Sequence, residues 1–372
     1  MANLLQNLRI VMRVAHIMCR YYPNIGGQEA LVKELDDRLV QKGMSVAVYA
    51  FDRDYSFPRK KHIDGVSVTR YKPIIGDPFY LPPPSFLKDL RNEPSILIHV
   101  HDIHSLLPLI VTLLKRRDQK ILLQPYYHRF GQGLIRQLLL NLYKRLLNSF
   151  VLSRIPLIVA ISRHEGNAIN TDFPRNRKII LVPGGVAIKE LKRFKWNPVR
   201  PKRILYAGGL RRYKNIDKLI HAFSLLISAR GEELRLVIDG DGPERGHLMR
   251  LAHDLGVSKY VEWKCSLTRH ELFAEYAKAQ VFVLLSPLES FSRVVRESLI
   301  IGVPTIVLNT GATAELVEKG VVEGVNSTRK EELAEAISKA LKIEETKVSL
   351  RQLGALDMDQ YAKELMALYR SL

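Results

Sequence analysis

The sequence is poor in cysteine and contains no long apolar run. Its 372 residues include only two cysteines, Cys19 and Cys265, so we expect no disulfide framework and a reduced, cytoplasmic setting. A membrane-spanning helix needs about 18–20 predominantly apolar residues, and no stretch of the sequence supplies them. No signal-peptide pattern opens the chain, and we expect residues 1–11 to be an extension ahead of a second natural start at Met12.

Acidic residues are scarce relative to basic ones. Lys and Arg number 57 and Asp and Glu number 38, which gives a formal net charge of +19. Such a charge attracts nucleic acid, an anionic membrane surface or phosphorylated substrates. The sequence has no helix-turn-helix pattern, zinc knuckle or RNP-type motif, so we expect no nucleic-acid partner. Basic residues alternate with aliphatic ones in residues 134–147, which predicts either a core helix or a basic amphipathic face on a membrane.

The length predicts two domains, because 372 residues exceed the usual ceiling for one hydrophobic core. The polar segment 192–202 contains two prolines and marks the boundary. We therefore predict one domain over residues 1–198 and a second over residues 199–349. Residues 350–372 are predicted to form a C-terminal helix that crosses back to the first domain.

The stretch from Glu289 to Glu297 is the strongest candidate site. An apolar run before it predicts a buried parallel strand, and Ser292 is a plausible N-cap for a short helix that stops at Gly302. Unpaired N–H groups at the start of that helix, from Phe291 through Arg293 to Val294, form a natural anion site. The alternative is an ordinary crossover with two solvated glutamates.

Two glycine pairs fall where a predicted strand passes into a predicted helix. Gly26 and Gly27 would let the backbone approach a ligand closely, but taken alone they favour a plain tight turn. The second pair is followed by three cations that suit a phosphate cradle, or that form a solvated basic turn. These cations are Arg211, Arg212 and Lys214.

Histidines at predicted strand ends raise the question of metal binding. His99 and His101 share one face of a strand, but no cysteine or clear acidic partner completes a tetrahedral set, so we expect no metal there. His128 follows the next strand and predicts either a strand cap or a reacting imidazole. Asp239 and Asp241 match the Asp-x-Asp pattern of divalent-metal sites, but they overlap a Gly-x-Gly-Pro turn, which we favour.

Taken in order, these motifs resemble those of the retaining glycosyltransferases of family 4 over nearly the whole chain. The resemblance implies the GT-B fold, an α/β architecture of two Rossmann-like domains whose parallel sheets face each other across a cleft. The matching residues are Tyr22-Pro23 with Gly26-Gly27-Gln28-Glu29, Ala160-Ile161-Ser162, Pro183 to Val186, Gly208 to Lys214, Gly240 to Glu244, Glu289 and Glu297 with Phe291, Gly302-Val303-Pro304, and Thr310-Gly311 with Glu315-Leu316.

The resemblance also implies roles for individual residues. Lys214 would bind the donor diphosphate together with the helix-end amides, Glu297 would accept hydrogen bonds from the donor ribose, and Glu289 would face the donor sugar at the reacting centre. Main chain near residues 264–267 would hold the base. Members of this family need no metal or other cofactor, so none is expected. The predicted acceptor-side residues are His101, Tyr126 and His128, the last as a catalytic group.

The sequence departs from the family pattern at several of these positions. Gly209 stands where the family usually has an arginine that shares the diphosphate with the lysine, and Arg211 or Arg212 is a candidate replacement. Ser292 stands where a glycine is common. The acceptor-side histidine of the family aligns best with Tyr126, and His128 follows two residues later.

The function predicted from these residues is transfer of a hexose, with retention of configuration, from a nucleotide diphosphate sugar to a sugar or lipid-linked acceptor. The protein would be cytoplasmic, with an anionic inner membrane surface as a further candidate partner. Two alternatives stay open. One is a GT-B epimerase or phosphorylase, and the other is a basic nucleic-acid-binding protein with a decayed crevice.

Overall fold

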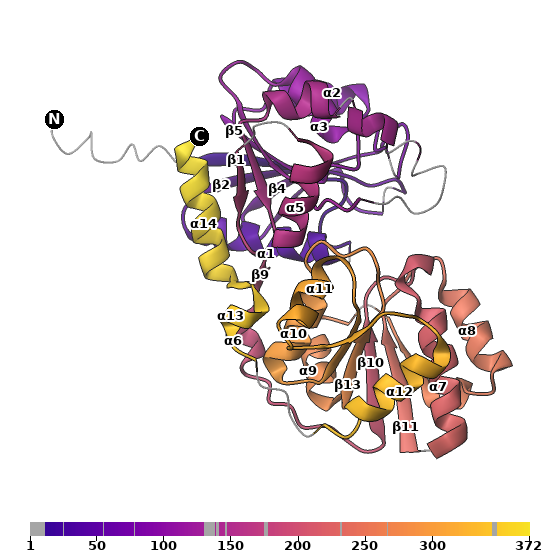
Figure 1. Ribbon diagram of the computed structural model, residues 1–372. Helices are drawn as coiled ribbons and strands as arrows, with labels where there is room; N and C mark the ends of the chain where they lie inside the picture. The colour runs from indigo at the N-terminus through magenta and orange to yellow at the C-terminus, as the bar shows by residue number, and fades with distance from the viewer. Residues whose placement is uncertain are drawn as a thin grey trace. The chain divides into compact units, whose positions relative to one another are not determined.

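The computed structural model describes residues 12–24, 26–54, 56–77, 79–129, 138, 141–145, 147–174, 178–230, 233–265, 267–343 and 348–372 (Figure 1). The expected extension over residues 1–11 and half of the stretch 134–147 lie outside these ranges. The chain divides into two compact units. Unit 1 comprises residues 1–24, 28–182 and 358–372, and unit 2 comprises residues 25–27 and 183–357.

Unit 1 is built on an eight-stranded sheet in its described residues, with the strand order β3-β4-β2-β1-β5-β6-β7-β8. All neighbouring strands are parallel except β3 and β4, which pair antiparallel at the edge. The strands are β1 (Arg13–Ile17), β2 (Ser45–Phe51), β3 (Lys60–Ile63), β4 (Val66–Tyr71), β5 (Leu97–His101), β6 (Lys120–Gln124), β7 (Leu157–Ala160) and β8 (Ile179–Leu181).

The two faces of this sheet differ in chemistry because side chains alternate along each strand. One face is apolar and packs Ile17 and Val100 against residues of the covering helices, such as Phe86 and Val111. Burial of each such side chain stabilises the unit by about 1.5–3 kcal/mol relative to exposure. The helices of unit 1 are α1 (Gly27–Gln41), α2 (Pro84–Arg91), α3 (Leu107–Leu114), α5 (Arg163–Asp172) and α14 (Met358–Ser371).

The last helix of the chain, α14, belongs to unit 1 although it follows unit 2 in sequence (Figure 1). It covers the second, more polar face of the sheet. The Tyr369 hydroxyl lies 2.7 Å from Nδ1 of His99, and Gln124 donates a 2.7 Å hydrogen bond to the Tyr361 hydroxyl. A helix at the end of the chain is thereby tied to strands β5 and β6.

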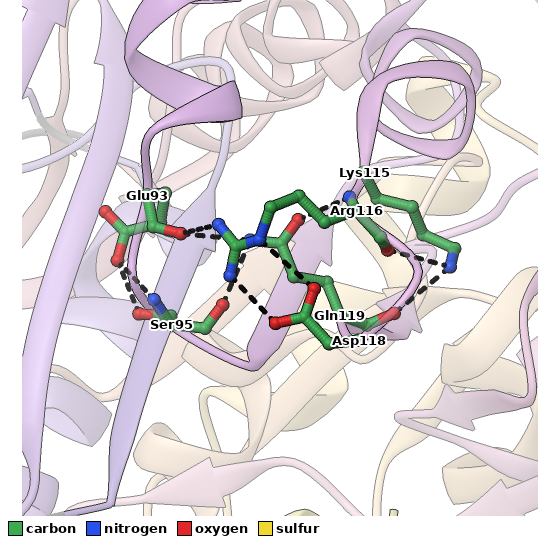
Figure 2. A network of polar contacts seen from close by, with 6 residues as sticks. All are labelled: Glu93, Ser95, Lys115, Arg116, Asp118 and Gln119. Carbon is green, nitrogen blue, oxygen red and sulfur yellow. Dashed lines mark hydrogen bonds and ion pairs between the residues drawn. The ribbon is translucent and has the colours of Figure 1, made fainter.

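A polar network joins the loops that precede β5 and β6 (Figure 2). The Glu93 carboxylate accepts hydrogen bonds from Ser95, from Tyr49 and from Arg13, the last at 3.0 Å. The Glu93 carbonyl oxygen accepts from Arg116 and, at 3.1 Å, from Gln119. Burial alone would raise the pKa of Glu93, but the hydrogen bonds to its carboxylate outweigh burial and hold the pKa below the ordinary 4.5.

Unit 2 is built on a six-stranded sheet whose described strands are all parallel, in the order β12-β11-β10-β13-β14-β15. Strands β9 and β16 form a separate parallel pair. The strands are β9 (Gly185–Val186), β10 (Lys202–Ala207), β11 (Leu234–Asp239), β12 (Val261–Lys264), β13 (Val281–Leu284), β14 (Thr305–Leu308), β15 (Glu323–Val325) and β16 (Leu356–Asp357). The helices are α6 (Ile188–Leu191), α7 (Ile216–Arg230), α8 (Arg245–Asp254), α9 (Arg269–Lys278), α10 (Arg293–Ile301), α11 (Gly311–Glu318), α12 (Lys330–Ala340) and α13 (Leu350–Leu353).

The α/β fold with parallel sheets in both halves is confirmed. The division between the units comes earlier in the chain than the prolines of residues 192–202, which gave the predicted boundary. It falls after residue 182, because Ala187 and Leu191 are buried in the hydrophobic core of unit 2 and β9 pairs with β16. Residues 350–357 likewise belong to unit 2, and the chain returns to unit 1 at Met358. Within the described residues, no helix combines the length and apolarity needed to cross a membrane.

We expect Glu93→Gln to lower the free energy of unfolding by about 1–3 kcal/mol near neutral pH, because donor groups of three residues, Arg13, Tyr49 and Ser95, lose a charged acceptor. The pKa of Glu93 is lower in the folded state, so its contribution is fully present above the unfolded value of 4.5 and is lost as the pH falls through the folded value. Urea unfolding at a series of pH values should therefore show the two proteins converging in acid. Glu331→Gln, at an exposed site, is the matched control, and a difference that stays constant with pH would contradict the assignment.

Candidate functional site

The start of α10 is unusual because its N-cap residue has a left-handed backbone. Ser292 occupies the N-cap position with φ of 57° and makes no side-chain hydrogen bond to the helix. Ser292 is thus the N-cap residue, as predicted, but its side chain does not cap the helix. An N-cap side chain reaches the helix amides from an extended backbone, and the left-handed conformation removes that geometry. The Ser292 hydroxyl is buried and has no hydrogen-bond partner among the described residues.

The left-handed conformation of Ser292 is a local strain. It costs a non-glycine residue about 1–2 kcal/mol, and such strain concentrates at functional sites. The first hydrogen bond within α10 runs from the Arg296 N–H to the Ser292 carbonyl at 3.4 Å, so the N–H groups of the first turn have no partner within the helix. The other end of the helix follows the prediction, because Gly302 caps it with φ of 99°.

Lys214 and Glu289 lie together although 75 residues separate them in sequence. Nζ of Lys214 is 2.5 Å from Oε1 of Glu289, and both side chains are about 15% exposed. Burial is the largest single influence and would lower the pKa of Lys214, but the charges of Glu289 and Tyr213 and the hydrogen bond to Glu289 together outweigh burial and raise it. Lys214 is thus held as a cation at the carboxyl end of the sheet. The site forms because parallel neighbours β10 and β13 end at the same edge.

The two candidate arginines near Lys214 differ in position. The charge of Arg211 is close enough to Lys214 to oppose the rise in the pKa of Lys214, whereas Arg212 is exposed. Gly209 is not a sterically required glycine, since an added Cβ would meet only the Asp241 carbonyl oxygen at 3.9 Å. Arg211 is therefore the better placed of the two to act beside Lys214.

Glu297 is fully buried and already holds two guanidinium groups. Nη1 and Nη2 of Arg269 lie 3.1 and 2.5 Å from its two oxygens, and Nε of Arg293 lies 2.9 Å from Oε1. Sequence reasoning did not identify Arg269, although its place next to the Thr268–Glu271 capping box fixes it at the start of α9. A ribose that bonds to Glu297 has to share this carboxylate with Arg269 or displace it. The Arg269 side chain is 35% exposed and so has room to move.

Arg296 is a second residue that sequence reasoning did not assign to the site. It is fully buried, its guanidinium lies 3.9 Å from the centre of the Phe291 ring, and its Nε donates to the Leu353 carbonyl at 2.9 Å. Burial lowers the pKa of Arg296 to about 10, against the opposing charges of Glu315 and Glu289. Arg296 thus packs against the Phe291 ring and places a second cation, in addition to Lys214, near Glu289.

Close backbone contacts fix the loops around the site. The Ala312 N–H donates to the Glu289 carbonyl at 3.2 Å, and Gly311, with φ of 60°, leaves no room for a Cβ without crowding that oxygen. At Gly240 an added Cβ would lie 2.0 Å from the Gly208 carbonyl oxygen, so these two loops require glycine for their approach. The Asp239 carboxylate accepts a 3.4 Å bond from the Leu267 amide, as part of this turn region.

The predicted site residues before residue 182 lie at strand and helix ends, as expected. Gly27 begins α1, with open space where a Cβ would project. His101 is fully buried at the end of β5, and the Tyr126 ring stacks 6.1 Å from it. The His128 N–H donates to Nε2 of His104 at 3.3 Å, and the two rings stack at 4.0 Å. His128 is partly exposed and is therefore more accessible to a ligand than His101.

Comparisons with known proteins match both halves of the chain. Residues 25–190 match the family model described as Glycosyltransferase Family 4, and residues 188–356 match the model described as Glycosyl transferases group 1. An uncharacterised glycosyltransferase of Methanocaldococcus jannaschii is 26% identical over 83% of this chain and 84% of its own length. The MMP alpha-(1->4)-mannosyltransferase of Mycolicibacterium hassiacum is 31% identical, but the match spans 45% of this chain and 40% of that relative.

Solved structures of similar fold cover almost the whole chain. Sucrose-phosphate synthase from Thermosynechococcus elongatus has a TM-score of 0.74 at 19% identity and covers 97% of this chain and 98% of its own. Anabaena HepE in complex with UDP and glucose has a TM-score of 0.70 at 15% identity, over 97% of this chain and all of that one. These likenesses establish the fold, which is the GT-B fold of two Rossmann-like domains.

The N-cap geometry of α10 predicts that Ser292→Ala leaves the free energy of unfolding within about 0.5 kcal/mol, because no capping bond is lost. Thr268→Ala is the matched substitution at α9, where the threonine side chain makes a complete capping box. It should cost about 1 kcal/mol. Chemical denaturation of both variants measures the difference. An equal loss at the two sites would show that Ser292 does cap its helix.

Proposed function

Because the chain belongs to glycosyltransferase family 4, we propose that it transfers a hexose from a nucleotide diphosphate sugar to a sugar or lipid-linked acceptor, with retention of configuration. The observation that carries the proposal is the pairing of Lys214 with Glu289 at the edge of the unit 2 sheet, where α10 begins. A cation and bare helix-end amides suit a diphosphate, and the adjacent carboxylate suits sugar hydroxyls.

The donor diphosphate binds Lys214, with Arg211 in place of the arginine that is absent at position 209. The amides of Phe291, Ser292, Arg293 and Val294 add donors at the helix start, where the helix dipole also favours negative charge. When the diphosphate binds, Lys214 pairs with it as well as with Glu289. One oxygen of the Glu289 carboxylate can then accept a hydrogen bond from a hydroxyl of the donor sugar. The ion pair keeps both groups charged before the donor arrives.

The nucleoside part of the donor lies toward Glu297 and the end of β12. Ribose hydroxyls bond to Glu297 as Arg269 moves aside, and main chain around Lys264 and Leu267 contacts the base. Burial of Glu297 strengthens each hydrogen bond that a ribose makes there, because the low local dielectric weakens competing solvation. No metal takes part in this scheme, since cations of the protein hold the diphosphate.

During transfer, negative charge grows on the leaving diphosphate as its bond to the sugar breaks. Lys214, Arg211 and the α10 amides already face the place where that charge develops, so they stabilise it without reorganisation. This stabilisation is the largest contribution to the rate that we assign to the site. The acceptor hydroxyl attacks the anomeric carbon, and a leaving phosphate oxygen takes the proton. On the acceptor side, His128 contacts the incoming hydroxyl, with Tyr126 and His101 behind it.

Several relatives carry names that fit this donor class. They include a mannosyltransferase, GDP-mannose-dependent mannosyltransferases and a structure that holds UDP and glucose. These names differ in sugar and in nucleotide, so they support a nucleotide diphosphate hexose as the class without selecting one member.

The proposal predicts that Lys214→Met lowers kcat/KM for transfer by about a hundredfold or more, because one donor to the leaving group is lost. Lys218→Met, at an exposed lysine nearby in sequence, should leave activity unchanged. Arg211→Met should lower kcat/KM by about tenfold. The assay measures nucleotide diphosphate release with UDP-, GDP- and ADP-sugars and a panel of acceptors. Absence of release with every donor would reject the proposal, and release that requires no acceptor would favour an epimerase.

The stretch 134–147 supplies an observation that supports a lipid-linked acceptor. Leu138 and Leu142 are 72% and 67% exposed, so in these two residues the stretch does not form the core helix that was one of its two interpretations. Exposed leucines close to the exposed Arg145 suit an anionic membrane surface, whereas Lys144 is mostly buried and paired with Asp172; we include such a surface among the proposed partners.

We expect the protein to co-sediment with vesicles that contain anionic phospholipid, and added salt should weaken the binding because part of it is electrostatic. The double substitution Leu138→Glu and Leu142→Glu should reduce vesicle binding by about tenfold or more, because two apolar side chains no longer enter the lipid interface. Leu350→Glu, at another exposed leucine, is the control. Equal binding by all three proteins would remove the membrane from the proposal.

A further inference from the structure

Three histidines from two neighbouring strands meet inside unit 1. His16 comes from β1, and His99 and His101 come from β5, where the register of the two strands pairs His16 with His99. All three side chains are fully buried. One ring nitrogen of each lies within 4.8 Å of the corresponding nitrogens of the other two, and the ring centres are 3.9–5.0 Å apart.

Two of the rings have a polar neighbour at Nδ1, which for His16 is an ion-pair contact without hydrogen-bond geometry. Nδ1 of His16 lies 2.8 Å from Oδ1 of Asp36 on α1, and Oδ2 of Asp36 accepts a 2.8 Å hydrogen bond from the Tyr21 hydroxyl. Nδ1 of His99 lies 2.7 Å from the hydroxyl of Tyr369 on α14. With these contacts at Nδ1, Nε2 of His99 remains for another partner. Nε2 of His16 lies 3.4 Å from the Tyr369 hydroxyl, and a metal ion would replace that contact. The carboxylate–imidazole arrangement at His16 is the one that commonly supports a metal-bound histidine.

The remaining polar atoms of the cluster lack partners within the described part of the chain. Neither ring nitrogen of His101 has a hydrogen bond, nor has the buried hydroxyl of Tyr126 beside it. Nε2 of His99 has no bond of good geometry either, although Gln124 lies beside that ring. Each buried polar atom left unsatisfied costs about 1–3 kcal/mol, so a cluster of them calls for a ligand.

We propose that His16, His99 and His101 bind a divalent transition-metal ion of the zinc class, in a structural site that joins β1, β5 and the helices α1 and α14. A water molecule or the Tyr126 hydroxyl completes a four-coordinate shell. The site lies wholly within unit 1 and takes no part in donor binding. His101 and Tyr126 also belong to the proposed acceptor side, so the test measures metal binding and not glycosyl transfer.

The ligand set selects the metal class. Imidazole nitrogen suits zinc, copper, nickel and cobalt, whereas magnesium and calcium prefer oxygen. Zinc–nitrogen bonds of about 2.0–2.1 Å require the ligand nitrogens to be roughly 3.3 Å apart, so the three rings close slightly on the ion. The expectation that this region binds no metal came from His99 and His101 alone. The third ligand lies 83 residues before His99 and becomes its neighbour only when β1 pairs with β5.

Direct metal analysis tests the proposal. The full chain is purified without metal affinity, stripped with a chelator, and titrated with Co²⁺ and then Zn²⁺. We expect one equivalent of Co²⁺ to bind with the intense visible absorption of a four-coordinate nitrogen site, Zn²⁺ to displace it, and Zn²⁺ to raise the Tm. Absence of stoichiometric binding, or only the weak absorption of a six-coordinate surface site, would overturn the proposal and leave a bridging water as the occupant.

Variants then assign the ligands. His101→Gln should abolish Co²⁺ binding, and Asp36→Asn should weaken it by about 10–100-fold because it removes the partner of His16. His253→Gln, at an exposed histidine, and Lys214→Met, at the donor site, should bind as the original chain does. Unchanged binding by His101→Gln would overturn the assignment. If His101→Gln does not fold, the cobalt spectrum of the unaltered chain and the graded effect of Asp36→Asn decide.

Discussion

The ion pair between Lys214 and Glu289 is the interaction on which the candidate site depends. It joins the loop after β10 to the loop after β13, and it keeps two charges largely out of water. Such a pair contributes little net stability, because desolvation offsets most of the attraction. Its value is in function, since it holds a cation and a carboxylate in their charged states at the place where an anionic ligand with hydroxyl groups has to bind.

The rest of the site surrounds this pair with further buried charge. Glu297 is enclosed by Arg269 and Arg293, and Arg296 lies against Phe291 with one guanidinium nitrogen unbonded among the described residues. A net excess of cations at a helix start is unfavourable for folding and favourable for binding a diphosphate. The left-handed backbone of Ser292 at the same helix start is likewise unfavourable for folding. Such local strain is typical of positions that contribute to ligand binding.

Much of the fold followed from local pattern. Local signals predicted the strands around Val281 and Thr305, the helix end at Gly302 and the capping box at Thr268. Apolar runs, C-terminal glycines and helix caps each depend on only a few neighbouring residues. The proximity of Lys214 and Glu289 was also predictable, since the carboxyl ends of parallel strands meet at one edge of a sheet. The boundary between the units was harder to predict. Prolines indicate a connecting segment, but they do not indicate which hydrophobic core a strand such as β9 joins.

The sequence by itself determined the α/β class, the order of the elements and the chemical types available at each strand end, because these depend on short-range periodicity and on the chemistry of single residues. Only the tertiary structure decided which distant groups meet. Arg269 reached Glu297, Arg211 rather than Arg212 came near Lys214, and His16 joined His99 and His101. Those contacts depend on strand order, register and helix packing, which are set by the summed burial of the whole sheet and by no local signal.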